Sequence, residues 1–285
     1  MSKPKLQRSR EAEILELSED VANEDCDSGK VCPTRICKAK GIGLIHNRYG
    51  KDKFDGMLVY RRSKWVILCN LDNGNERGST RERFTISHEL GHYHIPEHRR
   101  QLMAGCRSHP SKAGIFDGAA SVEELEADTF AANLLMPPGR FVPKLRRLRK
   151  PPLRSINELR REFDTSLEST AIQSMRHDPR ITAMAKWDNN ELAWHRIAEV
   201  YFKERGYRQF LLRDCSQLPA DSATAEAIAD ADTQYPSVIR ETVSRASDCF
   251  GYVSNEGNRN IVFREESVRN GRFGVVTIYS ELELP

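Results

Sequence analysis

The sequence lacks the features that mark membrane, secreted or cysteine-ligated zinc proteins. In its 285 residues, no apolar run approaches the ~20 residues that a membrane-spanning helix requires. The first residues mix Lys, Arg and Glu and contain no apolar core of a secretory signal. The seven cysteines are odd in number and form no C-x-x-C pair, which argues against a disulfide framework and against a cysteine zinc site. We therefore expect a cytoplasmic protein with reduced thiols and no membrane partner.

Charge is distributed unevenly along the chain, although the net charge is only +3. Residues 186–285 carry 12 Lys and Arg against 16 Asp and Glu, whereas residues 1–185 carry 32 against 25. At roughly 150 residues per domain, the length suggests about two domains. The change of sign supports this division, and the basic first part favours an anionic partner.

Hydrophobic periodicity predicts an α+β protein. In the first part we expect three strands between residues 42 and 69, an irregular segment over 97–120, one or two helices within 138–177, and helices over 8–25, 33–40, 80–95 and 121–136. In the last hundred residues we expect a helix near 190–205 and strands near 207–212, 249–254, 260–264 and 273–279.

These elements suggest three parts. Residues 1–137 would form a mainly helical domain, with a small three-stranded sheet packed on the helix over 80–95. Residues 138–185 would form a basic helical segment that resembles a helix-turn-helix. Residues 186–285 would form a smaller α+β domain, whose role the sequence leaves open.

The strongest chemical signal is His88-Glu89-Leu90-Gly91-His92, an H-E-x-x-H motif within the helix expected over 80–95. Residues four apart on a helix share one face, so both imidazoles can bind one metal ion. Glu89 is then placed to take a proton from the attacking water. The motif therefore predicts a metal-dependent hydrolase.

A third metal ligand is expected from the helix over 121–136, for which Ser121 is the predicted N-cap. Glu123, Glu124 and Glu126 are the alternatives. Glu124 lies four residues before Asp128, so these two share a helix face. Glu124 could bind the metal while Asp128 accepts a hydrogen bond from a ligand imidazole, and we favour this pair.

Together these segments resemble the ImmA/IrrE family of bacterial zinc metallopeptidases. The resemblance is carried by residues 81–92 and 124–137, with Asn70 before them and residues 163–171 after them, and it covers roughly residues 10–180. Asp128 stands where the family usually has Asn, and it accepts the same hydrogen bond. The resemblance implies a gluzincin-like His-His-Glu zinc site with a Glu general base. It also implies limited proteolysis of a helix-turn-helix repressor of a mobile element, a prophage or stress genes.

Zinc is the expected cofactor, and manganese suits the same ligands. The residue that would stabilise the oxyanion stays unknown from the sequence. Its candidates are Tyr93, His94, His98, Arg107 and His109.

A basic stretch over residues 140–161 supports an alternative function. It holds nine Lys and Arg against the single acid Glu158, which could form a nucleic-acid footprint. The leading hypothesis is a zinc-dependent endopeptidase that cleaves a regulatory protein. The alternative is a DNA- or partner-binding regulator with a structural or vestigial metal site.

Overall fold

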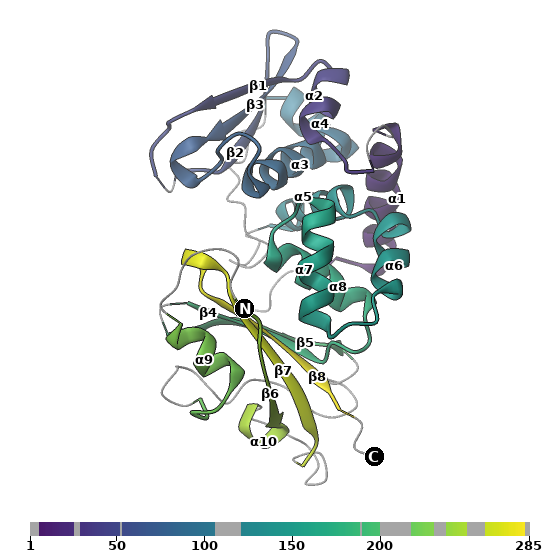
Figure 1. Ribbon diagram of the computed structural model, residues 1–285. Coiled ribbons are helices and arrows are strands. Elements are labelled where there is room, and N and C mark those ends of the chain that lie inside the picture. Colours follow the sequence, from purple (N-terminus) through teal and green to yellow (C-terminus); the bar gives the residue numbers. More distant parts are fainter. Residues whose placement is uncertain are drawn as a thin grey trace. The chain divides into compact units, whose positions relative to one another are not determined.

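The computed structural model in Figure 1 describes the chain except for residues 1–5, 26–28, 52, 106–120, 189, 200–217, 231–237, 250–259 and 283–285. Within the described residues the chain forms ten α-helices and two β-sheets, which confirms the expected α+β class. The chain divides into two compact units, Met1–Pro143 with Arg160–Ser169, and Lys144–Leu159 with Thr170–Pro285. Each unit has a hydrophobic core of its own. None of the described helices combines the length and the apolar character needed to cross a bilayer.

The first unit is mainly helical. Its helices include α1 (Arg8–Glu24), α2 (Pro33–Ala39), α3 (Thr80–His94), α4 (Pro96–Met103) and α5 (Val122–Leu135), followed by α6 (Pro138–Arg147) at its boundary. Its sheet has the order β1-β3-β2, with β1 (Gly43–Asn47) parallel and β2 (Gly56–Arg61) antiparallel to β3 (Lys64–Asn70). The expected three-stranded sheet is therefore present, and β2 and β3 pack on α3.

A two-residue turn fixes the register of β2 and β3. Arg62 and Ser63 both have positive φ, 50° and 61°, and Arg61 pairs directly with Lys64. Such turns match the twist of an antiparallel pair. Alternation along β3 then directs Trp65, Ile67 and Cys69 into the core.

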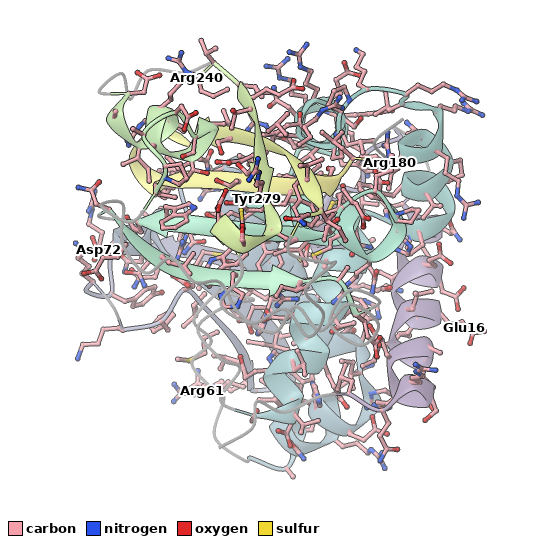
Figure 2. All side chains as sticks on the ribbon, turned by 90° about the horizontal axis from the view of Figure 1, so that it is seen from below. Glu16, Arg61, Asp72, Arg180, Arg240 and Tyr279 are labelled. Atoms are coloured by element: carbon pink, nitrogen blue, oxygen red, sulfur yellow. The ribbon has the colours of Figure 1, made fainter. Side chains whose placement is uncertain are left out.

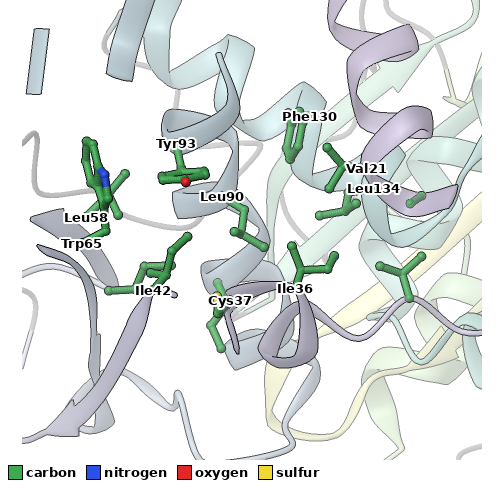
Figure 3. Packing of buried hydrophobic residues seen from close by; sticks show 14 of the residues in the cluster. Val21, Ile36, Cys37, Ile42, Leu58, Trp65, Leu90, Tyr93, Phe130 and Leu134 are labelled. Carbon is green, nitrogen blue, oxygen red and sulfur yellow. The ribbon is translucent and has the colours of Figure 1, made fainter. Parts of the chain in front are cut away.

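The core of the first unit forms where α1, α2, α3 and α5 meet the sheet. Figure 3 shows Leu90 and Tyr93 of α3 beside Phe130 and Leu134 of α5, with Val21 of α1 close by. The polar side of α1 faces outward, as Glu16 shows in Figure 2. The motif-bearing helix is therefore held on several sides by apolar packing, and its position is rigidly defined.

The free cysteines among the described residues are Cys32, Cys37, Cys69 and Cys249. Burial raises the pKa of the Cys37 and Cys69 thiols to about 12. These two thiols therefore behave as small apolar groups rather than as nucleophiles.

The second unit is built on a five-stranded antiparallel sheet. Its order is β5-β4-β8-β7-β6, and its strands are β4 (Ala183–Asp188), β5 (Glu191–Ile197), β6 (Arg240–Arg245), β7 (Val262–Arg269) and β8 (Val275–Glu281). The later helices of the chain are α7 (Pro152–Phe163), α8 (Leu167–His177), α9 (Ala223–Ala229) and α10 (Ala246–Cys249). Helix α9 packs on β6, β7 and β8. Tyr279 of β8 lies in this sheet (Figure 2) and is almost fully buried.

Three expectations about local structure were wrong. Over Glu191–Ile197 the helix expected near 190–205 is instead strand β5, because Glu191 and Leu192 favour a helix locally but pair with β4 in the sheet. The signal overlooked there is Asn190, whose φ of 63° suits a hairpin turn. Residues 200–205 lie outside the described residues. The segment over 97–120 begins with helix α4, because Pro96 occupies a first-turn position and starts a helix as well as ending one.

The third wrong expectation concerns the span over 138–177, which contains the three helices α6, α7 and α8 rather than one or two. The strand expected near 207–212 lies outside the described residues. Of the strand expected near 249–254, Cys249 ends helix α10 and the rest lies outside the described residues. The three-part division at residues 137 and 185 stays a prediction.

Candidate active site

Close packing of α3 against α5 builds the site. A Cβ on Gly91 would lie 3.1 Å from Ala127 Cα and 3.3 Å from Phe130 Cβ, so any side chain there would push the two helices apart. The glycine inside the H-E-x-x-H motif therefore lets α5 approach α3. Ser121 caps α5 by accepting a hydrogen bond from the Glu124 amide, which fixes the start of that helix.

Three side chains from these helices converge on one point. His88 Nε2 and His92 Nε2 are 3.1 Å apart, and they lie 3.3 Å and 3.4 Å from the two carboxylate oxygens of Glu124. Ligands placed about 2.0–2.1 Å from a zinc ion at tetrahedral angles would be separated by about 3.3 Å. The spacing of the three donors thus suits a tetrahedral ion with one position open. Among the described residues this is the group that could hold a metal ion.

Asp128 orients the first of these histidines. The Nδ1–H of His88 donates to Asp128 Oδ1 at 2.8 Å, and both side chains are buried. Burial disfavours a charged imidazole, but the carboxylates of Asp128 and Glu124 outweigh it and raise the pKa of His88 well above its usual value. Burial likewise opposes the charge of Glu124, yet the two imidazoles lower its pKa. With a metal ion bound, its positive charge would take the place of these protons.

Glu89 is almost fully buried and lies between α3 and the start of β2. A Cβ on Gly56 would lie 2.8 Å from Glu89 Oε1 and 2.5 Å from Thr85 Cγ2. Thr85 Oγ1 in turn donates to Asn75 Oδ1 at 2.8 Å. The Glu89 carboxylate therefore packs against the backbone of Gly56, which has no side chain. Glu89 follows His88 directly on the helix.

The structure separates the three glutamates that the sequence left as alternatives. Glu124 lies with the histidines, whereas Glu126 pairs with Arg10 of α1 and contacts His98. Glu123 is not part of the donor group. The difference follows from the helix, because Glu124 and Glu126 point about 200° apart.

The candidates for an oxyanion donor are dispersed. Tyr93 packs edge-on against Trp65 beneath the guanidinium of Arg99. His94 stacks on Phe130, and burial lowers its pKa to about 4. His98 lies behind His92, while Arg107 and His109 fall outside the described residues.

Residues 37–174 match the peptidase family model described as the IrrE N-terminal-like domain. This match confirms the resemblance of these residues to the ImmA/IrrE family. The match to a peptidase family indicates a metallopeptidase, which implies a bound metal and a protein substrate.

The fold extends the likeness beyond the matched residues. A solved structure of a Mycobacterium tuberculosis transcriptional regulator is similar, with a TM-score of 0.59 and 14% sequence identity. The similarity covers 95% of this chain and 76% of that chain, and at this identity it shows a common fold only. None of the curated proteins compared with the chain matches it significantly.

Two features of the site escaped the sequence analysis. Gly56 contacts Glu89 from a strand more than thirty residues earlier, and nothing in the local sequence marks this glycine. His98 was considered only as an oxyanion donor, and its contact with His92 was missed, although His98 follows His92 by six residues at the start of the next helix.

Proposed function

We propose that this protein is a zinc-dependent endopeptidase that cleaves a regulatory protein, most simply a helix-turn-helix transcriptional repressor. His88, His92 and Glu124 are the proposed metal ligands, and Glu89 is the proposed general base. The observation that carries the proposal is the convergence of His88 and His92 of α3 with Glu124 of α5, whose nitrogen and oxygen atoms lie 3.1–3.4 Å apart, next to Glu89 on α3.

The donor set fits zinc. Two imidazole nitrogens and one carboxylate are the ligands of a known class of catalytic zinc sites, in which a fourth position stays open. Glu124 Oε1 is buried and accepts no well-formed hydrogen bond in the described part of the chain, which suits an atom kept for a metal. Manganese prefers more oxygen ligands, so zinc is the better match for this set.

Each side chain of the site would have a separate role in peptide hydrolysis. A zinc ion bound here would supply a Lewis acid that polarises the scissile carbonyl and lowers the pKa of water. Glu89 would take the proton of the attacking water and then pass it to the leaving amine. Asp128 would hold the Nδ1–H of His88, so that Nε2 presents its lone pair to the ion. Packing of Gly56 against Glu89 would limit the carboxylate to one position.

The proposed substrate rests on two supports. The ImmA/IrrE resemblance implies cleavage of helix-turn-helix repressors, in mobile elements or in stress responses. The similar Mycobacterium tuberculosis protein is described as a transcriptional regulator, which agrees with a role in transcription.

The test compares new protein N-termini in cells that express the wild-type chain, Glu89→Gln or Glu123→Gln. Glu123→Gln makes the same chemical change one residue before Glu124 and serves as the matched control. We expect a small set of termini, within a repressor, in the wild-type and Glu123→Gln cells only. If cells that express the zinc-loaded wild-type chain contain the same termini as cells that express Glu89→Gln, the proposed function is wrong.

A DNA-binding regulator is the second candidate, favoured by one observation. Within the basic stretch, Arg146, Arg147 and Arg149 are exposed, and Arg154 is exposed on α7. A binding role predicts duplex affinity that falls steeply with salt, with a slope of roughly −0.9 for each phosphate contacted. Absence of duplex binding at low salt would remove this candidate.

A further inference from the structure

The two histidines of the candidate metal site are supported in different ways. His88 donates directly to a carboxylate, that of Asp128. His92 instead has a second imidazole behind it, with its Nδ1 3.1 Å from the Nδ1 of His98. His98 and His92 are both buried, with exposed fractions of 4% and 6%, so water does not take over this contact.

Behind His98 the contacts continue to a partly buried ion pair between Glu126 and Arg10. His98 Nε2 lies 3.0 Å from Glu126 Oε2. The guanidinium of Arg10 donates to both oxygens of Glu126, through Nε at 2.9 Å and through Nη2 at 3.0 Å. Arg10 also donates to Glu97 of α4 at 3.0 Å. This series of side-chain contacts from His92 to Arg10 thus joins helices α3, α4, α5 and α1.

The number of protons on each imidazole determines which nitrogen donates and which accepts in these hydrogen bonds. A neutral imidazole carries one N–H, so His92 can offer the Nε2 lone pair to a metal only if its proton sits on Nδ1. That proton then needs an acceptor, and His98 Nδ1 can accept only if the proton of His98 sits on Nε2. The Nε2–H of His98 in turn donates to Glu126, which is an anion held by Arg10. Every donor in this series meets an acceptor.

We infer that His98 is a positioning residue that holds His92 in the tautomer required for metal binding, with Glu126 and Arg10 fixing the orientation of His98. The inference rests on the proposed function, because it takes His92 as a metal ligand. It assigns to His98 a role that is distinct from metal binding and from oxyanion stabilisation.

The position of His98 makes this role specific. It follows His88 by ten residues, the spacing at which metzincins place a third histidine ligand. That motif has a glycine three residues after the second histidine, where this chain has Ile95. His98 faces Nδ1 of His92, whereas the metal-facing atom of His92 is Nε2. At this spacing His98 therefore supports His92 and does not act as a third metal ligand.

The experiment compares His98→Asn with His98→Leu in the full-length chain. These side chains have nearly the same shape, but only Asn retains an acceptor for the His92 proton. The readout is zinc affinity by competition with a chelator, together with the unfolding temperature of the metal-free chains. Loss of a residue that orients a metal ligand costs about 10- to 100-fold in affinity. We expect that loss for His98→Leu and a loss of less than about 3-fold for His98→Asn, with similar unfolding temperatures.

A second measurement uses the wild-type chain and does not depend on the folding of a variant. Long-range proton–nitrogen NMR spectra of the zinc-loaded protein identify which nitrogen of His92 carries a proton. A proton on Nδ1 supports the inference, and a zinc-bound Nδ1 overturns it. Equal zinc affinity of His98→Leu, His98→Asn and the wild type also overturns it.

Cleavage is not a readout here, so the two proposals fail separately. A chain that binds zinc with the expected dependence on His98, yet cleaves no protein, would contradict the peptidase proposal and leave the role of His98 intact. A wild-type chain that binds no zinc would overturn both.

Discussion

Gly56 and Glu89 are in such close contact that position 56 has no room for a side chain. A Cβ there would lie 2.8 Å from Glu89 Oε1 and 3.2 Å from Glu89 Cγ. The strand that carries Gly56 is itself held in place, because Asn75 donates to Asp55 O and to Asn70 O. Enlarging position 56 must therefore displace the side chains of Thr85, whose Cγ2 would lie 2.5 Å from the Cβ, and of Glu89, rather than the strand.

For Gly56→Ala we expect a loss of activity with metal binding retained. A misplacement of about 1 Å costs on the order of 100-fold in rate, so kcat should fall by about 10- to 100-fold. The measurement is peptidase turnover beside zinc content. Gly43→Ala is the control, since a Cβ on Gly43 of β1 meets its nearest atom, Val66 Cγ2, at an ordinary 3.4 Å. Full activity of Gly56→Ala would show that Glu89 is not the general base or is not fixed by this contact.

Asp128 should be replaceable by Asn but not by Leu. An amide oxygen accepts the Nδ1–H of His88 as the carboxylate does, so Asp128→Asn should lower zinc affinity only slightly. Asp128→Leu leaves this N–H buried without an acceptor, and affinity should fall by about 10- to 100-fold. Chelator competition measures both variants. A similar loss for Asn and Leu would mean that the charge of Asp128 matters more than its hydrogen bond.

Zinc should stabilise the unit that carries the site. A ligand at 100 times its Kd adds about 2.7 kcal/mol to the free energy of unfolding. The unfolding temperature of this unit should therefore rise by roughly 5–10 °C when zinc replaces a chelator. Calorimetry should show the same rise for Glu89→Gln, which keeps all three proposed ligands, and none for His92→Ala. A rise that persisted in His92→Ala would place the metal elsewhere.

Glu266 should make the second unit less stable as pH rises. Its side chain is buried, and burial raises its pKa to about 7, although the Leu153 N–H donates to it at 3.0 Å. Nearby Glu241 also raises this pKa, while Arg264 and Arg154 lower it. A carboxyl that holds its proton more tightly when folded contributes stability below about pH 4.5 and loses it as pH rises through 7. The loss by pH 8 should be about 1–3 kcal/mol.

The check is denaturant unfolding of the second unit between pH 4.5 and 8, for the wild type and Glu266→Gln. The variant cannot titrate at this position, so its stability should fall less with pH. Glu191→Gln removes an exposed carboxylate from β5 of the same sheet and should keep the wild-type pH slope. Parallel slopes for the wild type and Glu266→Gln would contradict the assignment.

The sequence by itself predicted the parts of the protein that depend on local periodicity. Helical spacing places His88 and His92 on one face, and the pairing of Glu124 with Asp128 singled out Glu124 from three glutamates. The short strands of the first unit were predicted correctly because short apolar runs bounded by glycines and charged turns are typical of strands. Where local preference conflicted with tertiary pairing, as over Glu191–Ile197, the predicted helix was wrong and the segment is a strand.

Only the tertiary structure decided which distant residues meet. The contact of Gly56 with Glu89, and the chain from His92 through His98 and Glu126 to Arg10, join segments that are up to 116 residues apart. Such contacts arise from how helices and strands pack, and packing is set by the whole core rather than by any short window of sequence. The local sequence therefore determined the chemical groups of the site, and the packing of α1, α4, α5 and β2 around α3 determined what supports them.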